Sequence, residues 1–287
     1  MERVDAIPSL PPRPRDAHKG AFGHVLIVAG SPGMAGAAVL SCRGALRSGS
    51  GLVTAATPAS LSPIVATAVS EATGILLPEG PAGSDPAALR AALRPLGEGR
   101  FQAVGIGPGL GTDLRARAVL EAVLELARCP IVIDADALNQ IAAGVSVPPS
   151  ASRVWTPHPG ELARLTGEKP RTDEERLAAA SRMAEKLGGV VVLKGHRTIV
   201  LEKVRYRVNA TGNPGMATGG SGDVLTGIIT SLLGQGLSPF DAASLGTHLH
   251  GKAGDIAAEN FGEVSLIAGD IVDALPAAFK EHVSRQA

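Results

Sequence analysis

Residues 209–223 read NATGNPGMATGGSGD, and residues 224–233 continue as VLTGIITSLL. The apolar residues of the second segment recur with helical spacing, so the sequence predicts a glycine-rich loop that runs directly into an amphipathic helix. Gly219, Gly220 and Gly222 carry no side chain that could block a ligand. Because the first N–H groups of a helix have no partners within it, this junction favours an anion such as phosphate.

One carboxylate, Asp223, lies at this junction. A carboxylate repels phosphate, but it suits a base that accepts the proton of a substrate hydroxyl beside a transferring phosphoryl group. The alternative is that Asp223 is an ordinary acidic residue of the first helical turn. The motif by itself does not separate the two interpretations.

The composition excludes several classes of partner. The chain has 287 residues, 45% of them hydrophobic, which is enough for one large α/β domain or two small ones. Lys and Arg number 27, as do Asp and Glu, so no net charge points to nucleic acid or to an anionic membrane. Aromatic residues make up 2%, too few for the stacking surfaces of most single-strand binders. No apolar run approaches the ~18 residues that span a bilayer.

The cysteines indicate a reducing compartment. Cys42 and Cys129 are spaced neither as a metal site nor as a disulfide framework, so we interpret both as buried apolar residues. The N-terminal segment lacks the apolar core of a signal peptide. A cytoplasmic location is therefore expected.

Expected strands and helices alternate along the chain. The patterns predict strands at residues 25–29, 51–57, 101–106, 130–138 and 189–193, a short strand from 153, a hairpin over 198–208, and weaker strand candidates at 64–68 and 74–77. Helices are expected up to about residue 46, after residue 160, from 224 and 239, and at 85–96, 114–127, 173–187 and 268–281.

This alternation indicates an α/β fold with a mostly parallel sheet and helices on both faces. We expect a proline-rich arm over residues 1–17 and a single domain over 18–287. In such sheets ligands bind beyond the carboxyl ends of the strands, so the turns that follow the strands should converge on one cleft.

Two common nucleotide motifs fail on this sequence. The phosphate-loop pattern Gly-x4-Gly-Lys-[Ser/Thr] is absent, and the turn over residues 105–110 lacks the third glycine of the dinucleotide-binding fingerprint. The features that remain are the glycine-rich junction with its carboxylate and the pair Lys194-Gly195 after an expected strand. Together they favour phosphoryl transfer from a nucleotide to a hydroxyl.

A set of motifs in fixed order resembles the NAD(P)H-hydrate dehydratase family over about residues 18–280. The motifs are Lys19-Gly-x-x-Gly23-His-Val, Gly30-Ser, Gly36-Ala37, Arg47-Ser-Gly-Ser-Gly51-Leu-Val, Gly107-Pro-Gly-Leu-Gly111, Asp134-Ala-Asp-Ala-Leu138, Thr156-Pro-His-Pro-Gly-Glu161, Val192-Leu-Lys-Gly195 and the junction that ends at Asp223.

The resemblance implies a three-layer α/β/α domain of the ribokinase-like fold. It implies an enzyme that removes water from the S epimer of NADHX or NADPHX, the hydrated nicotinamide cofactors, with ADP or alternatively ATP as co-substrate, and with Mg²⁺. Many members carry an epimerase domain ahead of the dehydratase. Because only about 20 residues precede the first motif here, a stand-alone dehydratase is expected.

The resemblance also assigns roles to residues of this chain. Asp223 would deprotonate the hydroxyl of the hydrate while phosphate is transferred to it, and Asn213 would position phosphate or a metal-bound water. No residues are assigned as metal ligands, because the nucleotide brings Mg²⁺ with it. The other expected contacts are Lys194, Gly195, His196, Arg197, Thr198, Gly219, Gly220, Ser221 and Gly222 for the nucleotide, and Ala37, Gly109, Gly111 and His158, with Asp223, for the hydrated cofactor.

Several polar residues retain a structural alternative. His158 could hold a turn between its two prolines, and Asp134 and Asp136 could cap the turn after their strand as readily as act in catalysis. The remaining ones are Lys194 as a strand-end charge, Glu161 as a first-turn residue, and His248 and His250 as helix-surface or packing residues.

Two other functions compete with the dehydratase. One is a kinase of the same fold that acts on a vitamin-precursor alcohol of the hydroxyethylthiazole type, and the other is a nucleotide sensor without catalysis. Small residues on one face of the helix that begins at 239 indicate packing between subunits, so we expect a homo-oligomer such as a tetramer.

Overall fold

A ten-stranded sheet runs through the centre of the computed structural model, which describes residues 1–284. Its strand order is β1-β10-β9-β8-β7-β6-β5-β2-β3-β4. The last three residues of the domain expected over 18–287 lie outside the described residues. The strands are β1 (Glu2–Arg3), β2 (His24–Val28), β3 (Leu52–Pro58), β4 (Thr73–Leu77), β5 (Ala103–Ile106), β6 (Ile131–Ile133), β7 (Arg153–Trp155), β8 (Val190–Leu193), β9 (Ile199–Leu201) and β10 (Arg205–Val208).

Parallel pairing links β4, β3, β2, β5, β6, β7 and β8, as the alternation of strands and helices predicts. Among the described strands only β9 runs against its neighbours, since a short turn after β8 and another before β10 leave no room for a crossover helix. β10 then pairs with β1 in parallel. The expected hairpin over 198–208 is therefore confirmed.

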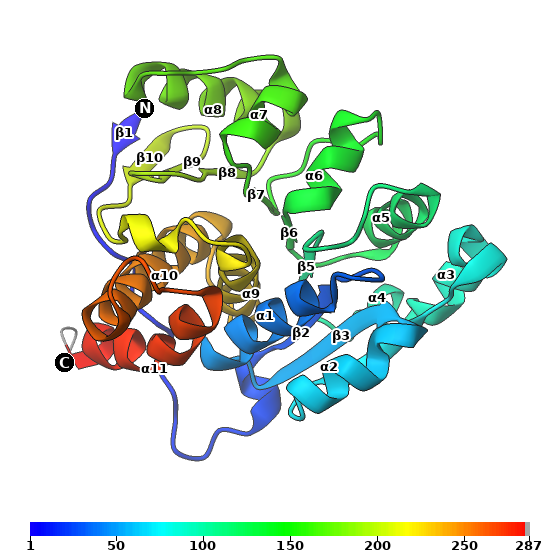
Figure 1. The fold of residues 1–287 in the computed structure, drawn as a ribbon. Helices are drawn as coiled ribbons and strands as arrows, with labels where there is room; N and C mark the ends of the chain where they lie inside the picture. The colour runs from blue at the N-terminus through cyan, green and yellow to red at the C-terminus, as the bar shows by residue number, and fades with distance from the viewer. Residues whose placement is uncertain (285–287) are drawn as a thin grey trace.

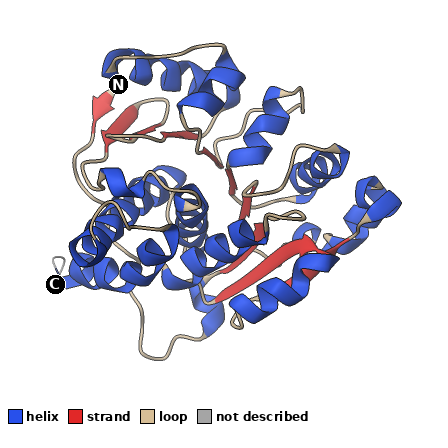
Figure 2. Cartoon of the chain, viewed as in Figure 1, coloured by secondary structure: helices blue, strands red, loops and turns tan. Residues whose placement is uncertain are grey.

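Helices cover both faces of the sheet, which confirms the expected three-layer α/β/α arrangement (Figure 1; Figure 2). One layer contains α1 (Ala35–Arg47), α2 (Ser62–Ala68), α9 (Ser221–Gly234), α10 (Pro239–Phe261) and α11 (Ala268–Ser284). The other contains α3 (Pro86–Ala92), α4 (Arg94–Gly97), α5 (Leu114–Leu126), α6 (Ala135–Ala142), α7 (Pro159–Thr166) and α8 (Asp173–Leu187). No helix among the described residues is long and apolar enough to cross a membrane.

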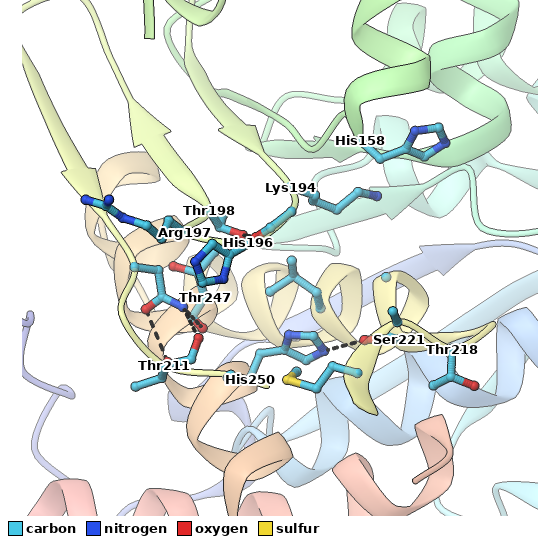
Figure 3. Close-up of a pocket in the computed structure, with 18 of the residues that line it drawn as sticks. His158, Lys194, His196, Arg197, Thr198, Thr211, Thr218, Ser221, Thr247 and His250 are labelled. Carbon is cyan, nitrogen blue, oxygen red and sulfur yellow. Dashed lines mark hydrogen bonds between the residues drawn. The ribbon is translucent and has the colours of Figure 1, made fainter. Parts of the chain in front are cut away.

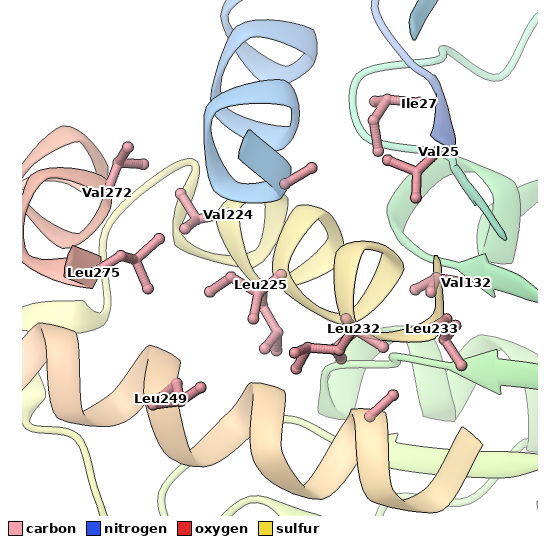
Figure 4. Close-up of a cluster of buried hydrophobic side chains, with 14 of the residues drawn as sticks. Val25, Ile27, Val132, Val224, Leu225, Leu232, Leu233, Leu249, Val272 and Leu275 are labelled. Atoms are coloured by element: carbon pink, nitrogen blue, oxygen red, sulfur yellow. The ribbon is translucent and has the colours of Figure 1, made fainter. Parts of the chain in front are cut away.

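Helix α9 is buried on all sides, so the expectation of an amphipathic helix was wrong. It lies between α1 and α10 and also packs on the sheet, and every residue from Val224 to Gly234 is buried (Figure 4). Gly227 allows α1 to approach, because an added Cβ would meet the carbonyl oxygen of Ser41. Burying one Leu or Ile side chain contributes about 1.5–3 kcal/mol, so the position of α9 is strongly fixed.

Three other expectations are corrected. Residues 64–68 belong to helix α2, where Val65 and Val69 are buried four residues apart, rather than to a strand. The strand expected over 130–138 ends at Ile133, because Ala135 has a φ of 49° and begins α6. The helix expected over 85–96 is interrupted at Leu93, since Pro95 has no N–H to continue it.

The proline-rich segment of residues 1–17 begins with β1 at the sheet edge and then crosses to the η1 turn (Lys19–Phe22). The guanidinium of Arg13 lies 4.0 Å from the ring centre of Phe22. This segment thus contacts the rest of the chain at both of its ends.

Candidate active site

A pocket of about 700 Å³ lies beyond the carboxyl ends of β6, β7 and β8. Its opposite wall is formed by the first turn of α9, the loop before it, and the middle of α10 (Figure 3). Because the strands are parallel and adjacent, the turns that follow them meet at one edge of the sheet. The volume lies within the range of ligand sites, about 300–1,000 Å³.

The pocket brings together most of the residues expected to bind the nucleotide. Those that line it are Lys194, Gly195, His196, Arg197, Thr198, Ser221 and Gly222, together with Asp223 and His158. In Figure 3 the 194–198 loop lies across the pocket from Ser221 and Thr218, and His250 enters from α10. The lining does not include Gly219, Gly220, Ala37, Gly109 or Gly111.

These remaining residues lie in neighbouring turns. Ala37 at the start of α1 packs against Gly109, where an added Cβ would lie 2.9 Å from that of Ala37. The N–H of Gly111 donates to the carboxylate of Asp136 at 2.9 Å. Asp136 in turn acts electrostatically on Asp223. The turn after β5 thus contacts Asp136, one of the carboxylates that act on Asp223.

The first turn of α9 is open to an anion. Its N-cap, Gly220, is left-handed with a φ of 90° and has no side chain that could occupy the first N–H groups. At Gly222 an added Cβ would lie 3.3 Å from the Nζ of Lys194. The helix N-terminus and an ammonium group therefore lie side by side, and both favour negative charge.

A buried charged cluster lies beneath this turn. Asp134, only 1% exposed, follows β6, and its two carboxylate oxygens accept hydrogen bonds from Lys194 Nζ at 2.6 Å and from Thr226 Oγ1 at 2.7 Å. Glu161 lies 3.9 Å from the same Nζ. Burial acts to lower the pKa of Lys194, but the carboxylates outweigh it and the pKa is raised. Lys194 is therefore charged at neutral pH.

Asp223 has the ionisation that a base needs. Burial and the neighbouring carboxylates Asp134 and Asp136 raise its pKa to about 7, against the lowering effect of Lys194. A base is most effective when its pKa is near the working pH. Its raised pKa and its place in the pocket lining therefore favour a base over an ordinary first-turn acid.

His158 and Glu161 form the capping box of α7. The Nδ1 of His158 accepts hydrogen bonds from the N–H groups of Gly160 and Glu161, and Glu161 accepts from the N–H of His158 at 2.7 Å. His158 therefore holds a turn and also lines the pocket. Its pKa is lowered by burial and by Lys194, so the ring is neutral at pH 7. Burial raises the pKa of Glu161 to about 6.

The loop after β8 is supported from behind by Arg176 of α8, a residue that the sequence analysis did not single out. Its Nη1 donates to the carbonyl oxygen of His196 at 2.9 Å and lies 3.2 Å from Asp173. Arg197 has a φ of 56° and pairs with the same carboxylate at 3.2 Å. No local pattern marks Arg176, because its partner is the backbone of a residue 20 positions away.

The loop before α9 is tied to α10 by side-chain amides. Asn213 donates to the carbonyl oxygen of Gly254 at 2.9 Å and to Asp255 at 3.1 Å, and it accepts the N–H of Gly215 at 3.0 Å. This geometry gives Asn213 a role in shaping the loop. His250, which was expected to be a packing residue, faces the pocket, and its Nε2 lies 3.3 Å from Ser221 Oγ.

The described residues contain no group of three His, Cys, Asp or Glu side chains that could hold a metal ion. A nucleotide-borne Mg²⁺ does not require one, because it is held mainly by phosphates and water with one or two protein carboxylates. The pocket lining can supply a carboxylate for such an ion, but not from Asp134, whose two oxygens already accept hydrogen bonds from Lys194 and Thr226.

The sheet, its two helical layers and the pocket define the class of ribokinase-like α/β/α proteins. Within this class the chain belongs to the NAD(P)H-hydrate dehydratase family, whose sequence profile matches residues 25–277.

Named relatives agree with this membership. The chain is 46% identical over 273 residues to the bifunctional NAD(P)H-hydrate repair enzyme Nnr of Moorella thermoacetica. The matched region covers 93% of this chain and 51% of that protein. It therefore spans about half the length of such relatives. It is 38% identical to the ADP-dependent (S)-NAD(P)H-hydrate dehydratase of Neisseria meningitidis, over 91% of this chain and 86% of that one.

A solved structure is similar along almost the whole chain. It is the ADP/ATP-dependent NAD(P)H-hydrate dehydratase of Bacillus subtilis, co-crystallised with ATP and Mg²⁺. The two structures have a TM-score of 0.82 with 32% identity, over 95% of this chain and 94% of that one.

Proposed function

We propose that the chain repairs damaged nicotinamide cofactors by dehydrating the S epimers of NADHX and NADPHX with ADP as co-substrate. The products are NADH or NADPH, AMP and phosphate. Family membership supports the reaction. The structural observation that carries it is Asp223, whose pKa is about 7 and which lines a pocket at the N-terminus of α9.

In the first step Asp223 accepts the proton of the hydrate hydroxyl. The hydroxyl oxygen bonds to the terminal phosphorus of ADP while the bond from that phosphorus to AMP breaks. The N–H groups of residues 219–222 and the ammonium group of Lys194 stabilise the charge that develops on the phosphoryl group. Mg²⁺ carried by the nucleotide would neutralise part of the phosphate charge.

In the second step the new phosphate ester is eliminated. Phosphate leaves with the bonding electrons of the C–O bond, because the lone pair of the ring nitrogen supplies electrons to the carbon. Loss of a proton from the neighbouring ring carbon then completes the double bond of NADH. Phosphate leaves far more readily than hydroxide, which is why the nucleotide is consumed.

The two substrates would approach Asp223 from different sides. Residues 194–198 would bind the AMP portion of the nucleotide, because this loop lines the pocket across from α9. The hydrated cofactor would contact His158 and the turns that contain Ala37, Gly109 and Gly111. The link from Gly111 through Asp136 to Asp223 supports this direction of approach.

The test is recovery of NADH absorbance when ADP and Mg²⁺ are added to NADHX. Asp223→Asn serves as the control for catalysis, and parallel titrations with ADP and ATP identify the co-substrate. Absence of NADH with either nucleotide, together with phosphorylation of a thiazole alcohol, would replace the proposal with the kinase. Nucleotide binding without any turnover would support the sensor.

The assembly and location remain part of the proposal. We expect a homo-oligomer, such as a tetramer, in the cytoplasm, where NADH and NADPH are used. Light scattering of the purified chain measures the assembly, and fractionation of the source cells measures the location. A monomer that retains full activity would remove the oligomer from the proposal.

A further inference from the structure

Asp134 is the most deeply buried charged residue of the pocket, yet the proposed reaction gives it no task. Its two oxygens are occupied by the Nζ of Lys194 and by the hydroxyl of Thr226, which come from β8 and α9. The carboxylate therefore bonds to side chains from two different elements of the fold.

Lys194 also lies beside the first turn of α9, which carries Asp223. Its Nζ lies 3.3 Å from the position of a Cβ on Gly222, the residue immediately before Asp223. Lys194 and Asp223 act on each other electrostatically. Without Asp134, Lys194 would keep the contact of 3.9 Å with Glu161, and Asp223 is the other carboxylate that acts on it electrostatically.

We propose that Asp134 is a positioning residue that keeps the ammonium group of Lys194 bonded to its own carboxylate, beside the first turn of α9, and so prevents it from pairing with Asp223. The base then stays available for a proton, and the ammonium stays available for phosphate. This inference rests on the proposed role of Asp223 as the base.

The groups around Asp223 make the consequence clear. The negative groups are Asp134 before α6 and Asp136 in α6, and the positive group is Lys194, which Glu161 of α7 also contacts. On α10, burial lowers the pKa of His250 to about 4, so this ring is neutral. Neutralising Asp134 removes a negative neighbour and also releases Lys194. Both changes lower the pKa of Asp223 and make it a weaker base.

The test is a pH titration of the Asp223 carboxyl carbon by ¹³C NMR in the full chain without substrate, with Asp223→Asn used to assign the signal. For Asp134→Asn the midpoint should fall by about 1–3 pH units. An unchanged or raised midpoint overturns the proposal. Since no substrate is present, a failure of the hydrate assay would refute the proposed function and leave this result unaffected.

A double-mutant cycle separates positioning from simple charge. In a Lys194→Met background, Asp134→Asn can act only through its own charge, so its effect on the midpoint should be about half of that in the wild type or less. Equal shifts in both backgrounds would show that Asp134 does not act through Lys194.

A third test uses two variants of Thr226, for the case in which Asp134→Asn does not fold. Thr226→Val preserves shape and every charge but removes one of the two donors that hold Asp134. It should lower the Asp223 midpoint by less than Asp134→Asn does, while Thr226→Ser, which retains the hydroxyl, should match the wild type. Identical midpoints for the two Thr226 variants would contradict the positioning role.

Discussion

The two sides of the pocket are built differently. Beneath the first turn of α9, Asp134 is 1% exposed and has a donor on each oxygen. Across the pocket, residues 195–197 are exposed, and Arg176 supports their loop from behind with one guanidinium nitrogen, Nη2, left without a partner. The first side is fixed by buried charge pairs, and the second by contacts of more exposed groups nearer to water.

This difference matches the two tasks that we propose for the site. Groups that stabilise a transition state must be held in place before the reaction, because reorganisation would consume the stabilisation they provide. Groups that bind the remote part of a nucleotide can adjust as it enters. Changes beneath α9 should therefore affect kcat, and changes in the loop should affect KM.

The largest effect is expected for Asp223→Asn. Loss of the base should lower kcat by about 10²–10⁴-fold, while the Kd for AMP stays near that of the wild type. Steady-state kinetics and calorimetry measure the two quantities. A parallel loss of AMP affinity would mean that this side of the pocket also carries nucleotide binding, and the contrast between the two sides would disappear.

The pH dependence should report the same carboxylate. Asp223 accepts a proton only when ionised, so kcat should fall by about tenfold per pH unit well below pH 7. Glu161→Gln is the control, since Glu161 titrates near 6 and its loss should not move the midpoint. If Glu161→Gln shifts the midpoint of the pH dependence of kcat, then Glu161 rather than Asp223 accepts the proton, and our mechanism is wrong on this point.

Whereas kcat should rise with pH, the stability of the folded protein should fall. The pKa of Asp223 is raised from its ordinary value of 3.8 to about 7 on folding, so the folded state retains a proton that the unfolded state releases. As the pH rises from about 4 to about 7, the free energy of unfolding of the wild type should therefore fall relative to that of Asp223→Asn. Above pH 7 the difference should stay constant. Thermal unfolding of both proteins at several pH values measures this difference.

The two glycines before α9 provide a matched pair of backbone variants. Gly220→Ala places a Cβ against Leu40 at a φ of 90°, which should cost about 1–3 kcal/mol of stability. For Gly219→Ala no atom lies within 4 Å of the new Cβ, so stability should be nearly unchanged. Chemical denaturation compares them. Equal stabilities would show that the turn before α9 is as adaptable as the loop after β8.

The smallest effect is expected for Arg176→Met. Loss of the bond to the His196 carbonyl should raise the KM for the nucleotide by about threefold to tenfold, with kcat almost unchanged, because a typical hydrogen bond contributes about 0.5–1.5 kcal/mol. Arg182→Met on the same helix removes only an exposed ion pair with Glu168 and should have no measurable effect. A fall in kcat for Arg176→Met would show that the loop after β8, like the residues beneath α9, must be held in place for catalysis.

Local patterns predicted the order of elements well where both chemistry and spacing were local. The continuous apolar run of β8, the charged helix α8, and the hairpin of β9 and β10 followed from their own residues. The predictions failed where packing decided the outcome. Residues 64–68 include three β-branched side chains, but they form α2: Val65 and Val69 are buried while Thr67 between them is exposed, a spacing that fits a helix and not a strand.

The candidate site shows the same division. The glycine loop and Asp223 were visible because both lie in one segment, whereas Arg176 and Thr226 carry no local signal of their role. Asp134 was noticed, but neither expected role describes it: its carboxylate caps no turn and instead bonds to side chains 60 and 92 positions away.

The sequence by itself determined the alternation of strands and helices, the glycine-rich junction before α9 and the single carboxylate at that junction, because each depends on neighbouring residues. Only the tertiary structure decided what that carboxylate can do. The adjacent carboxyl ends of β6, β7 and β8 bring Asp134, Glu161 and Lys194 together beneath α9. Burial among these charges raises the pKa of Asp223 to about 7, and burial is a property of the packed molecule rather than of any segment.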